Sequence, residues 1–107
     1  MNIADLIYQR RAKSADPEWI ADILGRLVWL MDDNGAEIHE AMVRWCESGS
    51  HEQASIALHS CDEVFLYETR EEMVAKFSGL QSRFPDLKSQ CDEIIQQWDK
   101  QFPNGIP

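Results

Sequence analysis

The apolar residues of this chain recur every three or four positions, which is the spacing of one face of an α-helix. The clearest example is a stripe near the C-terminal end: Leu87, Cys91, Ile94, Ile95, Trp98 and Phe102. Strong helix formers (Ala, Leu, Glu, Gln, Met, Lys and Arg) supply 48 of the 107 residues, whereas threonine occurs once and valine four times. Because β-sheets are enriched in β-branched residues, this composition predicts an all-α fold, a single compact bundle of five or six helices.

Helix-capping residues divide the chain into segments. Asp16 before Pro17 is a typical helix start, because the carboxylate caps the first turn and proline fits its first position. Asn34-Gly35 is a typical stop. These and similar signals predict helices at about residues 2–13, 17–33, 36–48, 51–67, 70–82 and 86–102. The fourth helix could break near residues 60–63, and residues 64–67 could instead form a short strand, for which no partner strand is evident.

The length and the lack of linkers predict one domain. A chain of 107 residues has the size of an ordinary domain, so we expect one all-helical domain over residues 1–107 with an extended tail at 103–107. The longest apolar run, Leu27 to Met31, is far shorter than the roughly 20 residues of a membrane-spanning helix. The opening residues lack the basic, apolar and small-residue series typical of a secretory leader, so none is expected. Three widely spaced cysteines are typical of thiols in a reducing compartment. We therefore expect a cytoplasmic protein.

The second and sixth helices are expected at the centre of the bundle. The second carries apolar residues around most of its circumference, which is typical of a helix covered on several sides. Trp19, Trp45 and Trp98 fall within apolar stripes and are predicted to be buried. Trp29 lies at the edge of its stripe, so we expect it to contact a partner.

Negative charge is concentrated in the middle of the chain. The net charge is −9, and residues 17–68 contain eleven acids but only two bases, Arg26 and Arg44. Phosphate backbones and anionic membranes repel such a chain, so direct binding to nucleic acid or to a membrane is not expected. Five acids flank the Asn34-Gly35 turn or follow it at helical spacing, which predicts an acidic strip: Asp32, Asp33, Glu37, Glu40 and Glu47.

An acidic strip can serve either solubility or the recognition of a basic partner. No strong catalytic motif is present, so our leading interpretation is a small non-enzymatic protein that binds another protein. Its most concrete form is an inhibitor or immunity-type antagonist of a basic target, such as a nuclease or a nucleic-acid-handling complex. The acidic strip and Trp29 are the predicted contact surface, and no cofactor is expected. A self-associating structural or adaptor bundle is another interpretation, with Trp29 or Tyr67 at the contact.

Two pairs of glutamates support an enzymatic alternative. Glu37-x-x-Glu40 and Glu68-x-x-Glu71 each place two carboxylates on one helix face, and two such pairs on neighbouring helices can bind Mg²⁺. The pairs are separated by 27 residues. They resemble those of the all-helical nucleotide pyrophosphohydrolases, although Glu71 stands where that family has aspartate. The resemblance implies a Mg²⁺-dependent phosphohydrolase with these four glutamates as metal ligands.

The other reactive residues form no recognisable motif. The three histidines lack the spacing of metal ligands on one helix, and five scattered glycines build no phosphate-binding loop. Cys46, Cys61 and Cys91 lie on or near apolar stripes, which favours inert thiols over nucleophiles. Apart from the glutamate pairs, the sequence predicts neither catalytic residues nor a metal site.

Overall fold

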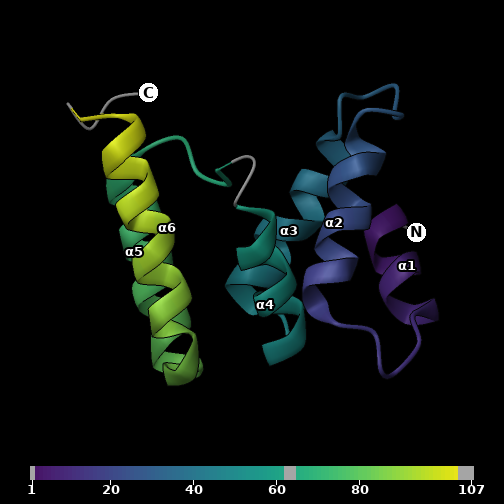
Figure 1. The fold of residues 1–107 in the computed structure, drawn as a ribbon, viewed down its shortest axis with the longest axis horizontal. Helices are drawn as coiled ribbons and strands as arrows, with labels where there is room; N and C mark the ends of the chain where they lie inside the picture. The colour runs from purple at the N-terminus through teal and green to yellow at the C-terminus, as the bar shows by residue number, and fades with distance from the viewer. Residues whose placement is uncertain (1, 62–64, 104–107) are drawn as a thin grey trace.

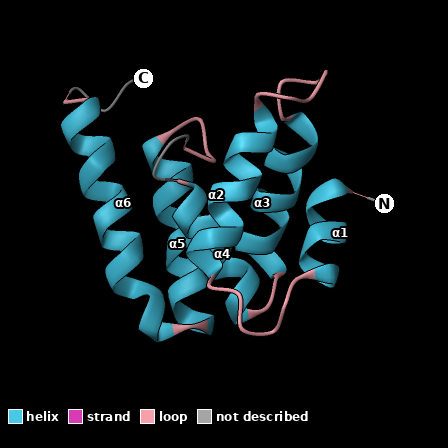
Figure 2. Ribbon diagram, turned by 45° about the vertical axis from the view of Figure 1, so that its right-hand side comes forward, coloured by secondary structure: helices cyan, strands magenta, loops and turns pink. Residues whose placement is uncertain are grey.

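Six α-helices and one short 3₁₀-helix make up the regular structure of residues 2–61 and 65–103, which the computed structural model describes (Figure 1). In chain order they are α1 (Ile3–Arg10), α2 (Pro17–Val28), α3 (Ala36–Ser48), α4 (His51–Ser60), α5 (Arg70–Arg83), η1 (Pro85–Leu87) and α6 (Lys88–Gln101). Within these residues there is no strand (Figure 2), and η1 leads directly into α6. The predicted all-α bundle is confirmed. The predicted tail at 103–107 lies outside the described residues, apart from Pro103.

Helices α3 and α4 lie in the middle of the molecule, with α1 and α2 on one side and the α5–α6 hairpin on the other (Figure 1). α4 packs against α2, α3 and α6, and α3 also contacts α1 and α5. The molecule measures 39 × 32 × 19 Å. Because a helix with its side chains is about 10 Å wide, the shortest dimension corresponds to two helix layers. Within the described ranges, no helix is both long enough and apolar enough to cross a membrane.

The centre of the core is α4, not the second and sixth helices as predicted. Ala54, Ile56, Ala57 and Leu58 of α4 are all buried, because neighbouring helices cover α4 from several directions. α2 and α6 lie nearer the edges, and each buries one stripe: Ile20, Ala21 and Leu24 in α2, and Cys91, Ile94 and Trp98 in α6. The prediction was wrong because apolar residues around most of a helix show only that the helix can be buried on several sides. The helices that pack against it decide which of those sides is buried.

The four tryptophans divide evenly between core and surface. Trp45 and Trp98 are buried, as predicted. Trp19 was also predicted to be buried, but it is exposed. Successive residues are about 100° apart around the axis of a helix. Ile20 lies on the buried face of α2, so its neighbour Trp19 is turned away from that face. Trp29, at the C-terminal end of α2, is exposed as well.

The second helix ends at Val28, five residues before the predicted end. The backbone N–H of Leu30 donates to the Leu27 carbonyl, three residues back, so the helical ladder is not continued. The chain then turns through Asn34 and Gly35, which both have positive φ, at 59° and 81°. A Cβ atom on Gly35 would lie 2.7 Å from a Val28 methyl carbon, so this turn requires glycine.

The first and fourth helices are also clearly shorter than predicted. α1 ends at Arg10, because Arg11 has extended backbone and its guanidinium donates to the Tyr8 carbonyl at 2.7 Å. α4 ends at Ser60, near the predicted break, and the described residues after the gap, 65–69, are not helical. There the ring of Phe65 packs against Trp98, with 4.8 Å between ring centroids. Of the possible strand at 64–67, residue 64 lies outside the described part.

Candidate functional site

Exposed apolar side chains gather on α2 and the turn that follows it. Five large apolar residues of the described chain are exposed: Trp19 (66%), Ile23 (49%), Trp29 (83%), Leu30 (79%) and Val74 (36%). The first four belong to α2 or to the turn after it, and only Val74 lies elsewhere, on α5. Single exposed apolar residues are normal on protein surfaces, so four of them within residues 19–30 mark this segment as a candidate contact element.

A groove of about 650 Å³ lies between α2 and α3 and reaches the C-terminal end of α4. Trp19 and Trp29 line it at opposite ends of α2. Its apolar lining includes side chains from both long walls and from the loop after α4: Leu24, Val28, Ile38, Met42 and Leu66. The groove therefore offers an apolar surface with an exposed indole at each end.

Small residues leave the space that the groove occupies. Ala21 and Gly25 lie one turn apart on α2, and Ala36 lies at the start of α3; all three line the groove. Ile20, which does not line the groove, is buried in the core, and α2 packs against α4. Small side chains at these lining positions occupy less of the space between α2 and α3 than large ones would.

The two walls of the groove carry different polar groups. Glu18 and Asp22 line the α2 wall, and no lysine or arginine is among the lining residues. Arg26, which forms an exposed ion pair with Asp22 at 3.3 Å, is not part of the lining. Helices α3 and α4 contribute one imidazole each, His39 and His59. His39 Nε2 lies 3.1 Å from the Leu66 carbonyl oxygen, and His59 Nε2 lies 3.3 Å from Nε2 of Gln90, which is outside the groove.

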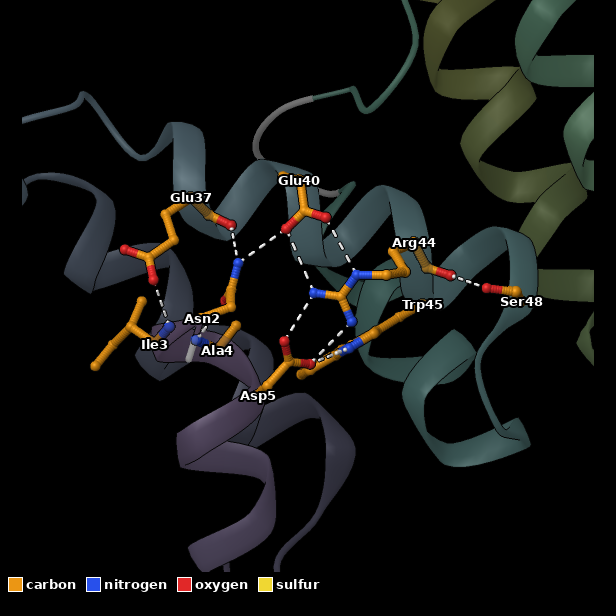
Figure 3. Close-up of polar contacts among 9 residues, drawn as sticks. All are labelled: Asn2, Ile3, Ala4, Asp5, Glu37, Glu40, Arg44, Trp45 and Ser48. Atoms are coloured by element: carbon orange, nitrogen blue, oxygen red, sulfur yellow. Dashed lines mark hydrogen bonds and ion pairs between the residues drawn. The ribbon is translucent and has the colours of Figure 1, made fainter.

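Most carboxylates of the predicted acidic strip are held by contacts within the chain, and Figure 3 shows those of Glu37 and Glu40. Glu37 Oε1 accepts the backbone N–H of Ile3 at 2.7 Å, and Glu40 accepts from Asn2 Nδ2 at 2.9 Å. Asp33 accepts the backbone N–H groups of Gly35 and Glu37 at 2.9 and 3.0 Å, which caps the start of α3. These three acids position α1 and α3, so their spacing on the chain reflects a structural role.

The two remaining acids of the strip, Glu47 and Asp32, differ in their contacts. Glu47 forms an ion pair with Lys76 of α5 at 2.9 Å. Asp32 is exposed in the turn between α2 and α3, close in sequence to Trp29. Of the predicted contact residues, Trp29 lines the groove, whereas none of the five acids does.

Arg44, the base within the acidic strip, is also engaged. Its guanidinium donates to Asp5 at 3.1 and 2.7 Å and to Glu40 at 3.1 and 3.3 Å (Figure 3). Asp5 additionally accepts the indole N–H of Trp45 at 2.9 Å. The hydrogen bonds from Arg44 hold the pKa of the Asp5 carboxyl below its ordinary value, and those from Asp5 and Glu40 raise the pKa of Arg44. This network fixes α1 on α3.

The glutamate pairs of the enzymatic alternative do not converge. Glu68 precedes Thr69, whose hydroxyl accepts the Glu72 backbone N–H and caps α5, so Glu68 is outside the helix that holds Glu71. In the described ranges, no three His, Cys, Asp or Glu side chains are placed to hold a metal ion. The four predicted ligands therefore form no common site.

The cysteines and Tyr67 are buried. Cys46, Cys61 and Cys91 are thiols of the core, and burial raises the pKa of Cys46 and raises that of Cys91 to about 11. Because the thiolate is the nucleophile, Cys46 and Cys91 are poorly suited to covalent catalysis. Tyr67, which was considered as a contact for self-association, is only 6% exposed, so that part of the prediction was wrong. Burial also raises the pKa of its hydroxyl.

The sequence predicted the residue at one end of the groove, Trp29, but not the other residues that line it. Trp29 was identified from its position at the edge of an apolar stripe, whereas Trp19 was assigned to the core. A usable signal was present in Ala21 and Gly25, two small residues one turn apart between the tryptophans. No known family model matches the chain, and no significant similarity links it to a curated protein or to a solved structure.

Proposed function

We propose that this protein acts by binding another protein, and that the groove between α2 and α3 is its contact surface. The observation that carries the proposal is the pair of exposed tryptophans, Trp19 and Trp29, at the two ends of an apolar groove. Tryptophan is enriched among the residues that dominate binding energy at protein interfaces. Burying one large apolar side chain contributes about 1.5–3 kcal/mol, so two indoles supply a substantial share of a moderate affinity.

The negative charge of the protein and of its groove favours a basic partner. The chain has a net charge of −9, Glu18 and Asp22 line the groove, and the lining contains no lysine or arginine. A partner with lysines or arginines beside its apolar contact residues is attracted from a distance, which raises the association rate. A second copy of this chain is repelled by the same charge, which favours a different protein over self-association. An antagonist of a basic target protein is the most concrete form of this function.

The proposal is tested by selecting binders from a displayed library of random peptides, with the purified protein as bait. Selected peptides are then measured against the wild type, Trp19→Ala, Trp29→Ala and Val74→Ala. Val74→Ala is the matched control, because it removes an exposed apolar side chain on α5, away from the groove. Circular dichroism of each variant checks that the fold is retained.

We expect the selected peptides to be basic and to bind more weakly as salt increases, because screening shortens the range of charge attraction. Each tryptophan variant should weaken binding at least about tenfold, which corresponds to about 1.4 kcal/mol, while Val74→Ala changes it little. Binding that survives both tryptophan variants contradicts the proposal. Sedimentation that shows a Trp29-dependent dimer of the wild type also contradicts it, in favour of self-association.

A further inference from the structure

We infer that the groove receives one amphipathic α-helix of the partner, lying along α2 with its basic residues toward Glu18 and Asp22. The inference rests on the proposed function and names the form of the partner's contact segment. Trp19 and Trp29 are ten residues apart, and a helix rises 1.5 Å per residue, so the groove wall between them is about 15 Å long. About three turns of a partner helix match this length.

The backbone of the walls favours a helix over an extended segment. Both long walls, α2 and α3, are helices whose peptide groups are already hydrogen bonded within the helix. An extended segment would place unpaired N–H and C=O groups against apolar side chains such as Leu24 and Met42, which line the groove, and burying unpaired polar groups is costly. A helix satisfies its own backbone groups, so it can occupy an apolar groove without a sheet edge to pair with.

Small residues on the walls fit the close approach of another helix. Ala21 and Gly25 share one face of α2, and Ala36 lies across the groove on α3. Small side chains let two helix axes approach more closely than leucine or methionine would. The apolar ridge of the partner helix can therefore lie between Trp19 and Trp29, with its large side chains at spacings of three and four residues.

The charge difference between the walls sets the orientation of the helix about its own axis. Carboxylates line the α2 wall, whereas α3 and α4 contribute His39 and His59 and none of the described lining carboxylates. Lysines on the flank that faces α2 meet Glu18 and Asp22, and lysines on the other flank meet imidazoles that offer no negative charge. A helix with basic residues on one flank should therefore bind better than one with them on both.

The test uses a synthetic leucine–lysine peptide of about fourteen residues, with leucines on one face and lysines along one flank. A second peptide has the same sequence with alternating D residues, which prevents the helix and leaves composition and charge unchanged. Fluorescence anisotropy of labelled peptides gives both dissociation constants. We expect the all-L peptide to bind at least tenfold more tightly. Equal affinities, or no binding by either peptide, would overturn the helix inference.

Failure of the helix inference can be distinguished from failure of the proposed function. If both peptides bind equally and both lose affinity with Trp29→Ala, the groove binds a basic partner but does not require a helix. If neither peptide binds, the library selection with its tryptophan variants still decides whether the groove is a contact surface.

Filling the groove from its walls provides a second readout. Gly25→Leu places a side chain in the groove and replaces a poor helix former within α2, so the melting temperature should rise by about 4 °C while peptide binding falls at least tenfold. Gly79→Leu on α5 is the matched control, because a Cβ atom at Gly79 has no neighbour within 4 Å; it should raise the melting temperature and leave binding unchanged.

Ala36→Phe fills the groove from the α3 wall, at an exposed position. It should also weaken binding at least tenfold. If Gly25→Leu lowers the melting temperature, the binding measured for Ala36→Phe decides whether the groove is the contact surface of the peptide. A folded groove-filling variant that binds the all-L peptide as tightly as the wild type would contradict the inference.

Discussion

The Asp5 carboxylate of α1 accepts a 2.9 Å hydrogen bond from the indole N–H of Trp45 on α3, forty residues away in sequence. Trp45 is only 1% exposed, so water cannot readily replace this acceptor. The same carboxylate receives two hydrogen bonds from Arg44. One short side chain thereby joins the first helix to the centre of the bundle.

Asp5→Ala should lower the free energy of unfolding by about 2–4 kcal/mol. The substitution removes a charge-assisted contact and leaves the buried Trp45 N–H without its acceptor, and each such loss costs about 1–3 kcal/mol. Urea unfolding followed by circular dichroism measures the change. Asp22→Ala is the matched control: its ion pair with Arg26 is exposed, and exposed pairs contribute little. Equal losses in the two variants would show that the Asp5 network does not hold α1.

The contribution of Asp5 should depend on pH in the acid range. Its pKa is lowered from 3.8 in the folded protein, mainly by the hydrogen bonds from Arg44. Between the lowered pKa and 3.8 the unfolded state binds more protons, so stability falls as the pH falls through this window. The difference in unfolding free energy between the wild type and Asp5→Asn should be constant near neutral pH and shrink below pH 3.8. A difference that stays constant through this window would contradict the assigned ion pair.

Truncating a tryptophan of the core should cost much more stability than truncating one of the groove. Trp98 is buried and packs against Phe65 and Phe102, at centroid distances of 4.8 and 5.0 Å. Trp98→Ala should therefore cost about 3–5 kcal/mol of stability. Trp29→Ala removes a side chain that is 83% exposed and should cost less than about 0.5 kcal/mol. Similar costs in urea unfolding would mean that the assignment of these two residues to core and surface is wrong.

The acids of the strip should differ in their effect on stability. The strip alone predicts that reversing its charges relieves repulsion and leaves folding intact. The structure predicts that Glu37→Lys costs about 1 kcal/mol, because it removes the acceptor of the Ile3 N–H at the start of α1. Asp32→Lys, in the exposed turn, should leave stability nearly unchanged. Thermal unfolding of the two variants compares them directly. An increase in stability for Glu37→Lys would instead support the expectation that the acids of the strip only repel one another.

The helices were predictable because their signals are local. Residues 36–48 were predicted to be helical, and α3 spans Ala36–Ser48. Ser50 caps α4 and Thr69 caps α5, so both helices begin at their predicted first residues, 51 and 70. In contrast, the non-helical course of residues 65–69 depends on distant partners, since Phe65 packs against Trp98 and Phe102. A local pattern of apolar residues does not contain those contacts.

The site was harder to predict because it is formed by packing between helices. Trp19 belongs to an apolar stripe, but α4 covers only the side of α2 that begins at Ile20. Glu37 and Glu40 of α3 have helical spacing, yet the donors that they accept from at the start of α1 lie 34 and 38 residues earlier. Spacing along one helix shows which residues share a face, whereas the neighbouring helices decide whether that face binds a partner or supports the fold.

The most direct test of the groove as the contact surface is a titration followed by NMR of the ¹⁵N-labelled indole groups. The four tryptophans report on two environments, because Trp19 and Trp29 line the groove and Trp45 and Trp98 are buried in the core. As the all-L leucine–lysine peptide is added, the signals of Trp19 and Trp29 should shift and saturate together, while those of Trp45 and Trp98 stay in place. Shifts at Trp45, beside the acids of α3, with no change at Trp19 and Trp29 would contradict the assignment of the groove.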